Sequence, residues 1–197
     1  MSFSLARGTE TAARLLDSCG AVEPLRLCMS ARDVQVEVCA GGSAARASLE
    51  RLAAAVGTTA LVGTAPAGSA AYSLTADLAE GIVLVAGIDE PAPGARRKDR
   101  STSTADAAEL LRTLEPWVRG LGRQVQPVAQ LWVEDQGDAF TVQLLATAGM
   151  GEDPQAVATA AGRGLDQLRV RRTDSGLDGT GRLPCGRTVR IGVVSLL

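Results

Sequence analysis

Arginine side chains gather near the C-terminal end of the chain, at a spacing that neighbouring strands would bring together. Arg169, Arg171 and Arg172 fall in one predicted strand, and Arg187 and Arg190 fall in the hairpin that follows it. Guanidinium groups form two-pronged hydrogen bonds with carboxylates and phosphates, so a sheet face carrying them could bind an acidic partner or a phosphate. The alternative is that these charges protect a solvated edge strand from pairing with other chains.

Carboxylates form the second group of residues that could do chemistry. Glu134, Asp135 and Asp138 surround a Gln136-Gly137 turn. Three oxygen donors could hold a divalent cation, but the spacing does not match a calcium loop. Acidic residues are also common at solvated hairpin tips, so we expect an ordinary turn here and no metal site.

The chain contains no histidine. This removes the usual general base near neutral pH, the histidine-activated nucleophiles and the commonest zinc ligand. The single lysine, Lys98, falls in a predicted linker, which is a poor place to position a catalytic group. We therefore expect a protein that is not an enzyme and that holds no cofactor.

Trp132 is a further candidate for contact with a partner. The alternation of its strand places it on the face opposite Leu131 and Val133, away from the predicted core. An outward tryptophan is typical of an interface, although a second layer of helices would simply bury it. The candidate interaction residues are therefore Trp132, Arg169, Arg171, Arg172, Arg187 and Arg190.

The elements that would position these residues occur twice along the chain. The segment from Leu78 to Ile88 returns from Leu183 to Val193, at a constant spacing of 105 residues that also relates Gly81 to Gly186. Each half has the order helix, two strands, helix, three strands. An internal duplication of this kind determines the architecture before any single residue is interpreted.

We therefore predict an α+β protein built from two tandem copies of this unit, each with an antiparallel sheet. The first copy spans residues 1–90, the second spans 104–197, and a linker rich in Pro, Gly and charge spans 91–103. A copy of about 90 residues is only marginally stable alone. We expect the two copies to pack against each other with pseudo-twofold symmetry.

The strand patterns also predict hairpin registers. In the first hairpin Met29 should pair with Val34, and Arg26 should lie opposite Glu37. In the second hairpin Val133 should pair with Phe140 around the Gln136-Gly137 turn.

Helix positions follow from apolar spacing and from end signals. Residues 104–121 have helical periodicity, and Pro116 predicts a kink or a break near Glu115. Asp153 followed by Pro154 predicts the start of a later helix.

The two copies differ most on one face. The apolar run Ile82–Val85 stands where the second copy has Arg187–Arg190. A duplicated protein whose copies diverge in this way has either specialised that face or buried it in one copy only.

Composition limits the class of protein further. A net charge of −2 over 197 residues is poorly suited to nonspecific phosphate binding by the whole chain. We find no charged-then-apolar leader and no apolar run of about twenty residues, which predicts a soluble cytoplasmic protein with no membrane contact. The four cysteines lack metal-like spacing and should be reduced thiols.

The stretch Ala12–Ile88, and more faintly Ala107–Val193, resembles a small α/β domain that recurs in predicted proteins of actinobacteria and their phages. The Leu-x-x-Gly turn and the glycine-broken strand carry the resemblance, which implies no catalytic residues. The element order is also similar to that of roadblock-type modules, which typically serve as dimeric scaffolds, and of sliding-clamp modules, whose basic helices face DNA. The weakly charged second helices, with Arg163 alone in the later one, argue against a clamp.

These observations predict a non-catalytic protein-interaction or assembly module that binds a protein partner or a second copy of itself. The first alternative is a nucleic-acid-associated protein that uses the arginine-rich sheet face of the second copy. The second alternative is a carboxylate- or metal-dependent enzyme.

Overall fold

The computed structural model describes most of the chain, and the statements below concern those residues alone. They are residues 4–22, 25–39, 42–64, 70–78, 81–88, 102–122, 125–126, 128–137, 139–174 and 176–195. Asp138 and residues 91–101 of the predicted linker lie outside them.

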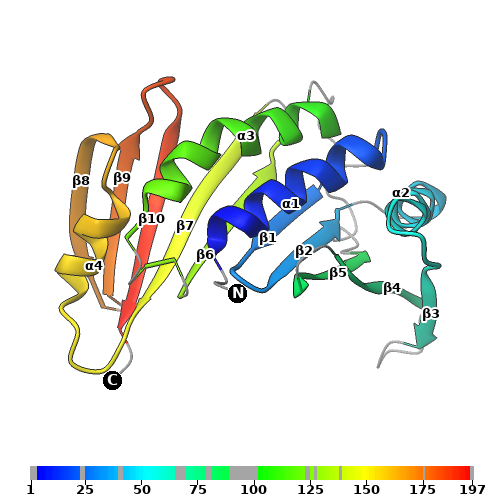
Figure 1. Ribbon diagram of the computed structural model, residues 1–197, viewed down its shortest axis with the longest axis horizontal. Helices are drawn as coiled ribbons and strands as arrows, with labels where there is room; N and C mark the ends of the chain where they lie inside the picture. The colour runs from blue at the N-terminus through cyan, green and yellow to red at the C-terminus, as the bar shows by residue number, and fades with distance from the viewer. Residues whose placement is uncertain are drawn as a thin grey trace.

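Ten strands form one continuous sheet (Figure 1). In chain order they are β1 (Leu25–Met29), β2 (Asp33–Val38), β3 (Leu61–Thr64), β4 (Ala70–Asp77), β5 (Val83–Ile88), β6 (Ala129–Asp135), β7 (Phe140–Ala148), β8 (Asp166–Thr173), β9 (Gly176–Arg182) and β10 (Thr188–Ser195). Their order across the sheet is β3-β4-β5-β2-β1-β6-β7-β10-β9-β8. The five strands of the first half thus lie together on one side of the sheet and end at β1. The five strands of the second half lie on the other side and begin at β6, which pairs with β1.

The prediction of a separate antiparallel sheet in each copy is wrong. β2 pairs with β5 in parallel, and β7 pairs with β10 in parallel, so the sheet is mixed. β1 and β6 pair with each other, which joins the strands of both halves into one sheet. Parallel neighbours need a crossover connection, and the segments containing α2 (Gly42–Ala55) and α4 (Pro154–Ala161) provide it.

All four helices pack on the same face of this sheet. α1 (Leu5–Ser18) and α3 (Thr104–Gly120) lie side by side across its centre (Figure 1). α2 contacts β2, β4 and β5, and α4 contacts β7, β9 and β10. Within the described part of the chain, no helix lies on the opposite face.

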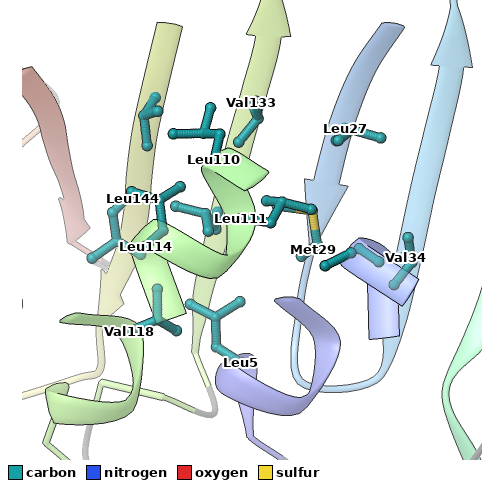
Figure 2. Packing of buried hydrophobic residues seen from close by; sticks show 14 of the residues in the cluster. Leu5, Leu27, Met29, Val34, Leu110, Leu111, Leu114, Val118, Val133 and Leu144 are labelled. Atoms are coloured by element: carbon teal, nitrogen blue, oxygen red, sulfur yellow. The ribbon is translucent and has the colours of Figure 1, made fainter. Parts of the chain in front are cut away.

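The core of the molecule runs along the junction of α1 and α3 above β1 and β6. Leu5 of α1, Leu111 of α3 and Met29 of β1 are fully buried there (Figure 2). Leu131 of β6 is fully buried in the same cluster. Met29 and Leu131 are cross-strand partners. Burial of each such side chain contributes about 1.5–3 kcal/mol, so this junction is a major source of stability for both halves.

The register of the first hairpin is as predicted. Met29 pairs with Val34, and Arg26 lies opposite Glu37. The predicted register of the second hairpin is wrong by two residues, because Val133 pairs with Val142 and the strands extend to a pair between Asp135 and Phe140. The same alternate side chains face the helices in either register.

Helix ends agree with the local signals, and of the two effects predicted for Pro116, a kink or a break, the break is absent. Ser103 and Asp106 form a capping box at the start of α3, and the hydrogen bonds from Ser103 lower the pKa of the Asp106 carboxyl. Asp153 caps α4 by accepting from the backbone N–H of Gln155. Pro116 does not break α3, which continues to Gly120.

The aligned Leu-x-x-Gly turns have the same local geometry. Leu78 donates to the carbonyl of Ile82 at 2.7 Å, and Leu183 donates to that of Arg187 at 2.9 Å. Gly81 and Gly186 have φ values of 77° and 84°, in the left-handed region that favours glycine.

Candidate interaction site on the open face of the sheet

The side chains of each strand alternate between two environments. Leu27 and Met29 of β1 pack beneath the helices, whereas Arg26 and Cys28 point to the other side. We call that other side the open face. It carries the alternate residues of every strand from β4 to β8.

Strand pairing arranges open-face side chains in rows across the sheet. The central row combines the cross-strand partners of eight strand pairs. From β4 to β8 it reads Thr75, Val85, Gln35, Cys28, Trp132, Gln143, Arg190, Thr180 and Arg169. Trp132 and two of the predicted arginines therefore share one row, although they come from three separate strands.

A network of ion pairs crosses the centre of the open face. Arg26 donates to Glu37 at 2.8 Å and to Glu134 at 3.2 Å, which ties together β2, β1 and β6. These hydrogen bonds raise the pKa of the Arg26 guanidinium above its ordinary value. Beside it Cys28 is only 2% exposed, and burial raises the pKa of this thiol to about 12.

A shallow hollow of about 560 Å³ lies on the open face over β7, β10, β9 and β8. We call it the basic hollow. Its polar lining consists of Gln143, Arg169, Arg171, Asp178, Thr180 and Arg190. Arg169 and Arg190 are separated by one intervening strand, which places their backbones about 10 Å apart.

The arginines of the basic hollow are nearly free of acidic neighbours. Arg171 lies 3.6 Å from Asp178 across the β8–β9 pair, and both side chains are largely exposed. Among the described residues, no carboxylate lies within 4.0 Å of Arg169 or Arg190. Their guanidinium groups are therefore available to an anion.

A smaller hollow of about 190 Å³ adjoins the basic hollow. Arg26, Trp132, Glu134 and Thr141 line it together with Gln143, which lines both hollows. Trp132 lies on the open face, away from the core, as the strand alternation predicts. It is half-buried because Cys28 and Gln143 flank it in the row.

Two of the predicted arginines lie apart from the other three. Arg172 alternates to the helix side of β8, where it lines a hollow of about 630 Å³ beside the start of α4. Arg187 lies before β10, donates to the carbonyl of Phe140 at 3.4 Å and lines a hollow of about 750 Å³ near α3. A single arginine-rich face that includes all five residues is not present.

Two carboxylates of the acidic turn, Glu134 and Asp135, lie within the described residues, and each interacts with other groups. Glu134 binds Arg26, and Asp135 accepts from Thr102 and from the N–H of Gly137 at 2.7 Å each. Asp138 lies outside the described residues. No three His, Cys, Asp or Glu side chains within the described chain converge as metal ligands would.

Sequence reasoning missed Gln143 and Thr180, which flank Arg190 on either side. Their strands alternate clearly, so their outward orientation could have been read from the sequence. The position of Gln143 beside Arg190 depends on the parallel pairing of β7 with β10, which no local pattern signals, whereas Thr180 reaches Arg190 within the β9–β10 hairpin.

The first half of the open face has the opposite charge. Asp33, Glu37 and Asp77 lie on it, and Val85 occupies the place in its row that corresponds to Arg190. Val85 is 44% exposed, which is unusual for a large apolar side chain. The open face is therefore acidic toward β4 and basic toward β8.

Comparison with protein-family models and with curated proteins finds no match for this chain. Among the helices that the structure describes, none combines the length and apolar character required to span a membrane.

Proposed function

We propose that this chain is a non-catalytic protein-interaction or assembly module that binds its partner through the open face. The observation that carries the proposal is the one-sided coverage of the sheet. The four described helices occupy one face, while the other exposes Val85 and the half-buried Trp132. Exposed apolar groups among polar neighbours are typical of surfaces that bind proteins.

We further infer that the two halves are copies of one unit related by a pseudo-twofold axis near the β1–β6 pair. The mirrored strand order and the matching Leu-x-x-Gly turns support this inference. On this view the first-half and second-half regions of the open face were once equivalent. Their present difference in charge is then a specialisation for a partner.

The proposal places the protein in the cytoplasm. All four cysteines are free thiols, and two of them are buried. Free thiols are typical of a reducing compartment.

A blocking experiment tests the proposed function. Partners recovered with the wild-type chain would be identified, purified and titrated against it, and sedimentation velocity would detect a second copy as partner. Thr75→Arg with Thr141→Arg places bulky charge on the open face, and Thr113→Arg with Gln155→Arg places the same charge on exposed positions of α3 and α4.

We expect the first variant to lose partner binding by about tenfold or more and the second to keep it, since a misplaced charge at an interface costs several kcal/mol. Retention of full binding by the open-face variant would contradict the proposal.

A nucleic acid remains the second candidate partner, and the grouping of Arg169, Arg171 and Arg190 near Trp132 favours it. Single-stranded nucleic acid binds grooves that combine cations with an aromatic platform. Such binding should weaken steeply with salt and disappear in Arg171→Glu with Arg190→Glu. Oligonucleotide binding that the double variant leaves unchanged would remove this candidate.

A further inference from the structure

We propose that the basic hollow is the docking site for an acidic segment of a partner protein, a run of Asp and Glu side chains that crosses β10, β9 and β8. This proposal rests on the proposed function of the open face and specifies the chemistry of the partner. It assigns Arg169 and Arg190 as the principal contacts, with Gln143 and Thr180 as neutral hydrogen-bonding neighbours.

Charge complementarity is the first argument. The row beneath the hollow presents Arg190, Thr180 and Arg169 in succession, and Arg171 lies in the adjacent row. Arg169 and Arg190 have no acidic partner within 4.0 Å among the described residues, and Arg171 has only a distant one. Guanidinium groups left unpaired in one shallow hollow favour a ligand that supplies carboxylates.

Spacing is the second argument. A peptide in the polyproline II conformation advances about 3.1 Å per residue with three residues per turn, so side chains three residues apart lie on the same side and are separated by about 9 Å. The backbones of Arg169 and Arg190 are about the same distance apart. A single segment in this conformation can therefore place one carboxylate on each arginine while its backbone passes over Thr180, which lies between them.

The surroundings favour an acidic peptide over a nucleic acid. Asp178 lies inside the basic hollow, and Glu134 lies beside Trp132 at its border. A phosphate at every nucleotide would meet these carboxylates, whereas a peptide can place neutral residues opposite them. Trp132 is also half-buried against its neighbours rather than presented as a free stacking surface.

Val85, the residue of the first half that corresponds to Arg190, indicates which substitution of Arg190 to test. Val85 is flanked by Gln35 and Thr75, just as Arg190 is flanked by Gln143 and Thr180. Arg190→Val therefore creates an arrangement that the first half already accommodates. This variant removes the charge and reproduces the strand neighbours of Val85.

The test measures binding of labelled octaglutamate to the full chain by fluorescence anisotropy. Binding of a labelled oligothymidylate of equal charge is measured in the same way, as a comparison with nucleic acid. Variants are Arg190→Val, Arg169→Glu with Arg190→Glu, and the control Arg163→Glu with Arg172→Glu. The control changes charge equally, because Arg163 and Arg172 are exposed but lie away from the basic hollow. Circular dichroism confirms that each variant is folded.

We expect octaglutamate to bind the wild-type chain and to weaken by about threefold to tenfold in Arg190→Val and by more than tenfold in the double charge reversal. The control should stay within about twofold of the wild type. Absence of octaglutamate binding, equal loss in the control, or tighter binding of oligothymidylate would each overturn the proposal. A wild-type dimer that the double reversal dissociates would assign the hollow to a second copy and would also overturn it.

Failure here is distinguishable from failure of the proposed function. The blocking substitutions Thr75→Arg and Thr141→Arg leave Arg169, Arg171 and Arg190 intact and test the open face as a whole. If those substitutions abolish partner binding while octaglutamate does not bind, the face is an interface and only its acidic specificity is wrong.

Discussion

Cys28 shows how neighbouring side chains can protect a residue on a face that none of the described helices covers. It lies between Gln35 and Trp132 in the central row and is 2% exposed, whereas Val85 in the same row is 44% exposed. Arg26, bound to Glu37 and Glu134, adds a second ordered element beside it. The centre of the open face is therefore well packed, and the adaptable groups lie toward its ends.

The buried thiols predict a stability loss at alkaline pH. Burial raises the pKa of Cys19 to about 11 and that of Cys28 to about 12, from an ordinary value of 9.0. Above pH 9 the unfolded chain releases these protons while the folded chain retains them, so the free energy of unfolding falls as pH rises. Below pH 9 both states are protonated and the thiols cause no pH dependence.

Urea unfolding at pH values on either side of 9 measures this effect. Each raised thiol should lower the free energy of unfolding by about 1.4 kcal/mol for each pH unit above 9. Cys28→Ala should remove about half of the slope, because Cys19 still contributes, and Cys185→Ala, which alters an exposed thiol, should retain it. An unchanged slope in Cys28→Ala would show that burial of this thiol does not govern the alkaline behaviour.

At the level of elements, α1 approaches the sheet most closely at Gly8. A Cβ atom at this position would lie 2.3 Å from the carbonyl oxygen of Ser30, in the turn between β1 and β2. Backbone cannot move away as a flexible side chain can. Gly8→Ala should therefore force α1 outward and lower the free energy of unfolding by about 1–3 kcal/mol.

Gly120 at the end of α3 is the matched control for this substitution. A Cβ atom there meets nothing within 4 Å. Gly120→Ala should be neutral or stabilise the chain by up to about 1 kcal/mol, since alanine restricts the unfolded backbone. Chemical denaturation compares the two variants, and equal effects would mean that the contact of Gly8 with Ser30 does not limit the position of α1.

The distance along the chain between paired strands determines which strand pairings could be predicted from the sequence. The first hairpin was predictable because its pairing is local and a charge pair, Arg26 with Glu37, supports one register. The second hairpin was displaced by two residues because alternation repeats every two residues and gives the same faces in either register. The parallel pairs β2–β5 and β7–β10 were missed because they join segments far apart in the chain.

The candidate site was only partly predictable for a related reason. Alternation places Arg169 and Arg171 on one side of β8 and Arg172 on the other. The separation of Arg172 from the basic hollow could therefore have been predicted from the sequence. The contact of Arg190 with Gln143 could not, because it depends on the parallel pairing of β7 with β10, whereas Thr180 reaches Arg190 through the local β9–β10 hairpin. Trp132 was correctly assigned to the face away from the core.

At the scale of the whole molecule, the β1–β6 pair and the contact between α1 and α3 join the two halves. Leu111 of α3 is fully buried in the cluster that also contains Leu5 and Met29 of the first half (Figure 2). An ion pair between Arg112 and Asp17 links the same two helices at the surface. Neither half can separate without exposing this shared core.

We therefore expect the chain to unfold as one cooperative unit, and its residues provide a separate probe for each half. Trp117 and Trp132, the only tryptophans, report on the second half by fluorescence. Cys19 and Cys28 are buried and report on the first half by thiol alkylation. Because both halves share one core, the two probes should give the same denaturation midpoint.

Leu111→Ala tests the coupling directly, because it removes apolar contact from a residue of the second half that packs in the shared core. A cavity of this kind costs about 2–5 kcal/mol. If the halves are one unit, the substitution lowers the fluorescence midpoint and the alkylation midpoint by the same amount. If the first half were stable alone, the fluorescence midpoint would fall while the alkylation midpoint of Cys19 and Cys28 stayed at its wild-type value. That result would show that the shared core does not determine the stability of the protein.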